Sequence, residues 1–161
     1  MSTPTEEPGS TDREFVVERT FHAPAARVFA AYTDPALLSR WWGPKGSTFI
    51  VEAMDVRPGG AYRFVQRDPK GQTIVFVGKY LEVRPVTRLV YTFEVEGMGN
   101  EIRATVDLKE TGGKTAVRLT SLCVSKEARD MMVQYGAVAG AQSVWKQLEE
   151  LVRGTTPAEG A

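Results

Sequence analysis

Hydrophobic residues recur with two different spacings along this chain, and the change of spacing separates strand regions from helical ones. Between residues 48 and 122 apolar and polar residues alternate, and turns that contain Gly or Pro interrupt the alternation at regular intervals. A period of two is typical of β-strands, and turns of this kind join antiparallel hairpins. The pattern predicts strands at 48–56, 61–67, 73–83, 89–96, 101–109 and 115–122.

The residues before this region predict one further strand and two short helices. Residues 14–21 are β-branched and aromatic with polar residues at both ends, which favours a strand. Pro24 suits the start of a helix, and apolar residues follow it. Asp34 is a good N-cap and Pro35 a good first residue for a second short helix, which a Gly-Pro turn at 43–44 ends.

The last element is predicted to be one long helix over residues 126–153, with Ser125 as its N-cap. Its expected apolar stripe consists of Met131, Met132, Tyr135, Val138, Ala139, Trp145, Leu148 and Val152. A helix with one apolar side must lie on the sheet. Gly136 and Gly140 remove two side chains from it, which indicates either a close approach to the sheet or free space beside the helix.

Seven strands and one long helix predict an α+β fold in which a curved antiparallel sheet wraps round the helix. One helix cannot fill the concave side by itself, so either large side chains or a cavity must lie there.

Trp41 and Trp42 precede the Gly-Pro turn. We expect one indole in the core and the other at an edge or an opening, because indoles are rarely buried completely.

The chain has 161 residues, with 20 Lys and Arg against 20 Asp and Glu, one histidine and one cysteine. This length predicts a single domain. Balanced charge argues against nucleic acid as a partner, and the short apolar runs argue against membrane insertion. The lone Cys123 and the lack of a signal-peptide pattern predict a cytoplasmic protein. Residues 1–12 and 154–161 are expected to be disordered tails around a folded domain at 13–153.

Several short motifs occur in an order that is typical of one family. They are Ala23-Pro24-Ala25-Ala26-Arg27-Val28-Phe29, Tyr32-Thr33-Asp34-Pro35, Leu38-x-Arg40-Trp41-Trp42-Gly43-Pro44, Asp55-Val56-Arg57-Pro58-Gly59-Gly60, Gly78-x-Tyr80-x-Glu82-Val83-x-Pro85 and Arg88-Leu89-Val90-Tyr91-Thr92. With these motifs the chain resembles the heat-shock-protein ATPase activator homologues of the START-like (SRPBCC, helix-grip) superfamily. The resemblance implies a helix-grip fold with a deep, mainly apolar pocket between the sheet and the last helix.

The chain departs from the family pattern in its last helix. Relatives usually have a Gly-Trp pair there, whereas here Gly140 is followed by Ala141, and a tryptophan comes one turn later at Trp145. The missing indole either enlarges the pocket, or Trp145 refills the space. The sequence leaves both possibilities open.

Few residues indicate catalysis. The resemblance implies that the first and last strands pair, which puts His22 and Cys123 at opposite ends, about 26 Å apart and too far for a dyad. One histidine and one cysteine cannot form a zinc site, and no glycine loop has the context of a phosphate site. We therefore assign no catalytic residue, metal or cofactor. The carboxylates that an acid–base mechanism would use are expected on the solvated strand face: Glu52, Asp55 and Glu82.

Candidate ligand-binding residues come from the tryptophan pair, the aromatic strand positions and the last helix. They are Trp41, Trp42, Tyr62, Phe64, Phe76, Tyr80, Tyr91, Phe93, Met131, Tyr135, Val138, Gln142 and Trp145. Core packing also explains the aromatic residues, so ligand contact is a separate hypothesis. Gln142 is either a buried amide that needs a polar partner or a half-exposed residue at the margin of the stripe.

Three functions are consistent with these features. The first is a cytoplasmic binding protein, monomer or homodimer, that holds a small apolar or aromatic molecule in the cavity. The second is a cyclase-, aromatase- or hydrolase-type enzyme that uses the same cavity. The third is a stress-response or co-chaperone-like interaction module in which the cavity has no role.

Overall fold

The computed structural model describes residues 11–154 as four helices and seven strands after a short 3-10 turn. In chain order the elements are η1 (Thr11–Arg13), β1 (Glu14–Phe21), α1 (Ala25–Thr33), α2 (Pro35–Leu38), β2 (Thr48–Met54), β3 (Ala61–Arg67), β4 (Thr73–Arg84), β5 (Arg88–Val95), β6 (Ile102–Thr111), β7 (Lys114–Leu122), α3 (Lys126–Gln134) and α4 (Ala137–Gly154). The predicted tails, 1–12 and 154–161, fall almost entirely outside the described residues.

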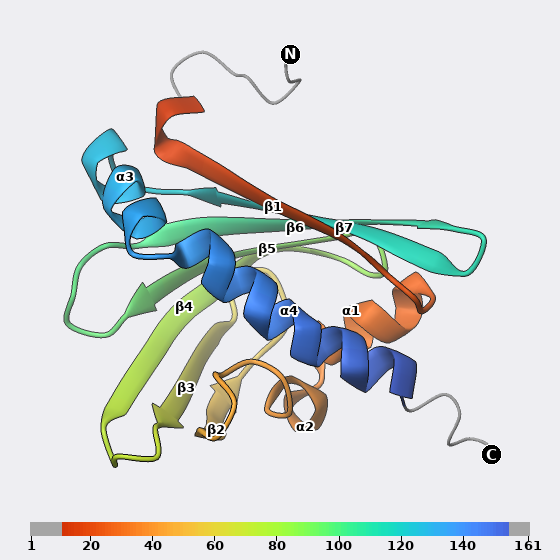
Figure 1. Ribbon diagram of the computed structural model, residues 1–161, viewed down its shortest axis with the longest axis horizontal. Helices are drawn as coiled ribbons and strands as arrows, with labels where there is room; N and C mark the ends of the chain where they lie inside the picture. The colour runs from red at the N-terminus through yellow and green to blue at the C-terminus, as the bar shows by residue number, and fades with distance from the viewer. Residues whose placement is uncertain (1–10, 155–161) are drawn as a thin grey trace.

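The strands form one antiparallel sheet in the order β1-β7-β6-β5-β4-β3-β2. This confirms the predicted seven-stranded sheet, and each strand begins and ends within two residues of its predicted bounds. Shifts of register between Val51 and Ala53 in β2 and between Tyr80 and Glu82 in β4 interrupt the pairing. Such irregularities bend and twist strands, and β2, β3 and β4 run steeply across the direction of β1, β6 and β7 (Figure 1).

Local sequence accounts for the two short helices. The Asp34 carboxylate accepts a hydrogen bond from the Ala36 N–H at 2.9 Å, and Pro35 occupies the first turn of α2. Helix α1 buries one face, and the indole N–H of Trp41 donates to the carbonyl of Ala31 at 2.9 Å. This bond holds the end of α2 against α1.

The predicted single C-terminal helix is wrong in one respect, because Gly136 divides it into α3 and α4. Gly136 has a φ of +90°, in the left-handed region, and its N–H donates to the carbonyl of Val133 at 3.0 Å. A glycine in this conformation typically ends a helix. Helix α4 begins directly afterwards and is the long helix that crosses the sheet (Figure 1). No helix within residues 11–154 is both long and apolar enough to cross a membrane.

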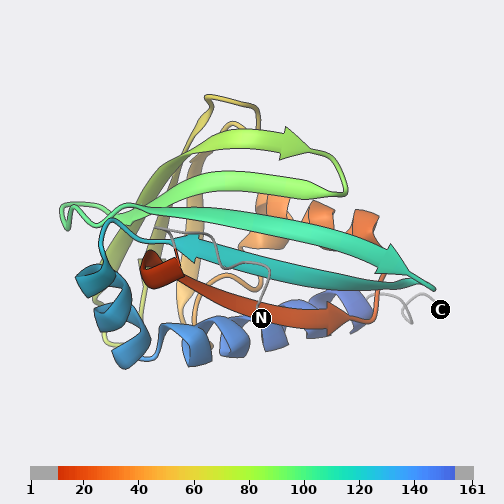
Figure 2. The same cartoon turned by 90° about the horizontal axis from the view of Figure 1, so that it is seen from above.

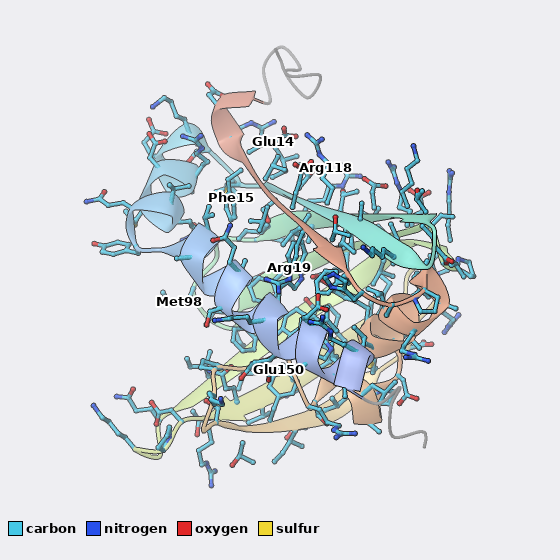
Figure 3. The ribbon with its side chains drawn as sticks, turned by 45° about the vertical axis from the view of Figure 1, so that its right-hand side comes forward. Glu14, Phe15, Arg19, Met98, Arg118 and Glu150 are labelled. Atoms are coloured by element: carbon cyan, nitrogen blue, oxygen red, sulfur yellow. The ribbon has the colours of Figure 1, made fainter. Side chains whose placement is uncertain are left out.

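Helix α4 runs alongside β1 and packs with α1 against the sheet (Figure 2). Trp145 and Leu148 are buried on its inner side, and the Trp145 ring meets Phe21 edge to face at 5.5 Å. On the side of α4 that faces β1, Arg19 lies between the strand and the helix (Figure 3) and forms an ion pair with the buried Glu149. The sheet, α1 and α4 therefore enclose one core, and the cavity lies beside it.

Candidate functional site: a cavity between the sheet and α4

A cavity of about 340 Å³ lies between α4, the tryptophan pair and the inner face of strands β3 to β7. Pro44 and Gly140 belong to its lining and are exposed, so its mouth lies between the α2–β2 loop and α4. Its lining consists of Tyr32, Trp41, Trp42, Pro44, Gln66, Phe76, Tyr91, Phe93, Ile102, Ala104, Leu119, Ala137, Gly140, Ala141, Val144 and Trp145. Six of the proposed ligand-binding residues are thus brought together: Trp41, Trp42, Phe76, Tyr91, Phe93 and Trp145.

The two indoles of the tryptophan pair have the different environments expected of them. Trp41 is 2% exposed and packs edge to face on Tyr32 at 4.9 Å. Trp42 is half-buried, and its ring lies 5.8 Å from the rings of both Phe64 and Phe93. Trp41 therefore supports the core, while Trp42 forms a wall of the cavity.

The first turns of α4 line the cavity with small residues, whereas Phe76, Tyr91 and Phe93 contribute aromatic rings from the sheet. Ala137, Gly140 and Ala141 face the space, and a methyl group added at Gly140 would meet no atom within 4 Å. Trp145 is held in the core by Phe21, and its indole N–H donates to the Tyr32 hydroxyl at 2.9 Å. Trp145 therefore leaves the space beside Ala141 open, which decides between the two possibilities that the sequence allowed.

Tyr62, Phe64 and Tyr80, also proposed from the sequence, form an aromatic layer that does not line this cavity. The Tyr62 and Phe64 rings are stacked at 4.5 Å, and the Tyr62 hydroxyl donates to the carbonyl of Thr92 at 2.5 Å. Gly78 makes this bond possible, because a side chain there would meet both partners. This layer supports Tyr91 and Trp42 from behind.

The remaining proposed residues, all from the C-terminal region, lie outside the cavity. Met131 and Tyr135 on and after α3 are 55% and 80% exposed, because the break at Gly136 ends the helical phase that placed them on the inner stripe. Val138 packs against the edge of the core without lining the cavity. Gln142 is exposed on the side of α4 that lies near Glu18 and Arg19 of β1, so it is not a buried amide of the cavity.

The sequence interpretation missed Gln66, which is 7% exposed and lines the cavity from β3. Tyr62, Phe64 and Gln66 alternate on the inner face of this strand. Its amide lies against the loop after Trp42, since a methyl group at Gly43 would come within 2.9 Å of the Gln66 Oε1. The alternating burial along β3 agrees with this inward position, but a polar residue near a strand end gives no sequence signal of a place in a cavity.

The cavity has polar groups but no ionised ones. Burial raises the pKa of the Tyr91 hydroxyl well above its usual value, and burial likewise raises the pKa of Tyr32, with the hydrogen bond from Trp145 acting in the opposite direction. Both hydroxyls therefore stay protonated at neutral pH. The residues that line the cavity include no Asp, Glu, Lys, Arg or His.

The carboxylates considered for catalysis form ion pairs away from the cavity. None of them belongs to its lining. Each forms an ion pair with an arginine, and the side chains of all these pairs are partly or fully exposed. The pairs are Glu52 with Arg63 at 2.8 Å, Asp55 with Arg57 at 2.8 Å, and Glu82 with Arg84. Their place on the solvated face agrees with the expectation from sequence.

His22 and Cys123 are as far apart as expected. The register pairs Glu14 with Leu122 and Phe21 with Thr115, which places the two residues at opposite ends of the β1–β7 pair. Burial raises the pKa of the Cys123 thiol, and this side chain is 2% exposed. The His22 Nδ1 lies 3.0 Å from the Glu149 carboxylate, so the histidine belongs to an ion cluster on the other side of α4.

Comparison with known proteins places this fold and cavity in context. The model of the family described as activator of Hsp90 ATPase homolog 1-like protein matches residues 22–153. An X-ray structure of a protein from Chromobacterium violaceum is 28% identical, with a TM-score of 0.75 over 87% of this chain and 96% of that one. A protein from Nitrosomonas europaea is 25% identical, with a TM-score of 0.82 over 91% and 97%. No curated protein sequence matches significantly.

Proposed function

The chain belongs to the activator of Hsp90 ATPase homolog 1-like family, and we propose that it binds a small hydrophobic or aromatic molecule between its sheet and α4. The observation that carries this proposal is the cavity of about 340 Å³, which has aromatic and aliphatic walls and an exposed mouth at Pro44 and Gly140. This volume falls within the usual size of small-molecule sites, which are concave and mostly apolar.

Burial of apolar surface supplies the affinity. A ligand that buries about 300 Å² of apolar surface gains about 7 kcal/mol before the costs of association. The aromatic rings of Trp42, Tyr91 and Phe93 provide flat surfaces on the sheet side, while Ala141 and Gly140 leave room on the helix side. This shape favours a planar ring system over a flexible chain.

The chemistry of the walls supports binding over catalysis. General acid–base catalysis needs a group whose pKa lies near the working pH. The cavity lining has no carboxylate and no histidine, and burial moves the pKa of Tyr91 away from neutrality.

We place the binding activity in the cytoplasm, because the chain has one cysteine and Cys123 is free and buried.

A pair of substitutions on adjacent residues of α4 tests the proposal. The probe is N-phenyl-1-naphthylamine, an uncharged dye whose fluorescence rises in an apolar site. We expect Gly140→Leu to lower its affinity at least tenfold, because the new side chain fills open space at the mouth. The matched control is Ala139→Leu, at an exposed position on the β1 side of α4 that does not line the cavity, which should leave the affinity unchanged.

The thermal midpoint of Gly140→Leu should exceed that of the wild type, because leucine favours a helix more than glycine does. The midpoint of Ala139→Leu should stay close to that of the wild type, because leucine favours a helix almost as much as alanine does. A wild-type protein that does not bind the dye, or two variants that weaken binding equally, would contradict the proposal. Native mass spectrometry of freshly purified protein adds an independent measurement, because a retained molecule would reveal its mass.

A further inference from the structure

One polar side chain in the cavity has no role in the fold. Gln66 is more than nine-tenths buried and lines the cavity, and within the described residues its side-chain amide has no hydrogen-bond partner. Buried amides in proteins are nearly always hydrogen-bonded, since leaving one unpaired is unfavourable. The amide therefore has a donor and an acceptor free for a molecule in the cavity.

The position of Gln66 fixes where that partner must lie. Its amide is next to Gly43, and the following residue, Pro44, forms part of the exposed mouth. Trp42 and Tyr91 also bring polar groups to the lining, an indole N–H and a hydroxyl. Gln66 pairs with Ile74 and Tyr91 with Tyr80, so their backbone positions are six residues apart along β4, or roughly 20 Å, and Gln66 is the one beside Gly43 and the mouth.

The residues that line the cavity indicate that the partner of Gln66 is uncharged. An ionised group inside the cavity would lose its hydration without gaining a counter-ion, because no charged side chain belongs to the lining. Arg40 and Lys45 lie outside the mouth but are exposed, and exposed ion pairs contribute little to binding. An uncharged group that both donates and accepts hydrogen bonds suits an amide side chain best.

The following inference rests on the binding function proposed above. We propose that the ligand is an uncharged aromatic molecule with one amide-like polar group that pairs with Gln66 at the mouth. Its apolar rings enter first and lie between Trp42 and the small residues of α4. Gln66 is then the specificity-determining residue of the cavity.

Three naphthalenes of similar shape test this inference: 2-naphthamide, 2-naphthoate and 2-isopropylnaphthalene. Their affinities are measured by displacement of N-phenyl-1-naphthylamine from the full-length protein at neutral pH. We expect the amide to bind at least tenfold more tightly than the carboxylate. In Gln66→Leu, the affinity ratio of the amide to the hydrocarbon should fall about tenfold, because the amide loses its partner.

Two control variants isolate the effect. Gln72→Leu removes an exposed glutamine from the β3–β4 turn and should leave all three affinities unchanged. Tyr91→Phe removes a hydroxyl group from the cavity lining and should keep the preference for the amide. The comparison of amide with carboxylate needs no variant, so it decides the charge preference even if Gln66→Leu does not fold.

The outcomes separate this inference from the proposed function. If no naphthalene and no dye binds, the binding function itself fails. If all compounds bind and Gln66→Leu leaves the ratio unchanged, the role of Gln66 is wrong while the binding function stands. If the carboxylate binds more tightly than the amide, the inference is overturned in favour of an anchor at Arg40 and Lys45.

Discussion

Glu149 is a carboxylate on the inner half of α4 and is only 5% exposed. It lies 3.0 Å from the His22 Nδ1, 3.6 Å from the Arg19 Nε and 3.7 Å from an Arg153 nitrogen, and its Oε2 also accepts the backbone N–H of His22. These contacts join α4 to the end of β1. Removal of the carboxylate loses these contacts, but the three basic partners are 35–59% exposed and remain hydrated, so the loss is moderate.

We therefore expect Glu149→Ala to lower the free energy of unfolding by about 1–2 kcal/mol, as measured by urea denaturation. The matched control is Glu150→Ala, at the exposed neighbouring position, which should change stability by less than about 0.5 kcal/mol. Equal effects of the two substitutions would show that the ion cluster does not stabilise α4. Dye binding measured on both variants distinguishes loss of fold from loss of the cavity.

At the scale of elements, the junction of α3 and α4 depends on the conformation of one residue. Gly136 has a positive φ, and the α3 that it ends has no buried residue. Two hydrogen bonds help to hold helix α3 in place. The Arg129 side chain donates to the carbonyl of Glu14 at 3.0 Å, and the Ser125 side chain caps the first turn. The element is therefore attached to β1 more weakly than α4 is to the core.

Gly136→Ala should destabilise the protein by about 1–2 kcal/mol, because alanine adopts the left-handed conformation only with strain. Hydrogen exchange should show faster exchange in α3 with little change in α4. The control is Gly140→Ala in the interior of α4, where space is open, and it should stabilise the protein by up to about 1 kcal/mol. A neutral Gly136→Ala would mean that α3 and α4 can join into one helix.

For the whole molecule, the tyrosines make stability sensitive to alkaline pH. Burial raises the pKa of Tyr32, Tyr62, Tyr80 and Tyr91 above the usual value of 10.0. Above pH 10 the native state then keeps protons that the unfolded chain loses. The folded state consequently loses stability as pH rises, by roughly 1.4 kcal/mol per pH unit for each such tyrosine.

Absorbance of tyrosinate at 295 nm during an alkaline titration measures this effect, with circular dichroism as the parallel measure of folding. We expect most of the absorbance change to coincide with unfolding, since four of the five tyrosines are buried. Ionisation of these four in a protein that remains folded near pH 10 would contradict their placement in the inner layer.

Local sequence patterns were sufficient for most of the fold. The Asp34-Pro35 pair marks the start of α2, and the aromatic character of Tyr62 and Phe64 favours the inner face of β3, where the structure has them. These features depend on backbone geometry within a few residues, so they can be recognised in one chain. The tryptophan pair is of the same kind, because two adjacent indoles cannot share one environment.

The sequence by itself thus determined the strands and the two short helices, since each depends on spacing or turn chemistry between neighbours. Its ordered motifs also carried the resemblance to the family. Only the tertiary structure decided which positions of the last helix face inward. The left-handed Gly136 resets the helical phase, which moves Tyr135 to the surface, and the packing of α4 leaves Gln142 outside. Tertiary structure also decided that Gln66 meets the cavity and that the space beside Ala141 stays open, because both depend on segments that are distant in the chain.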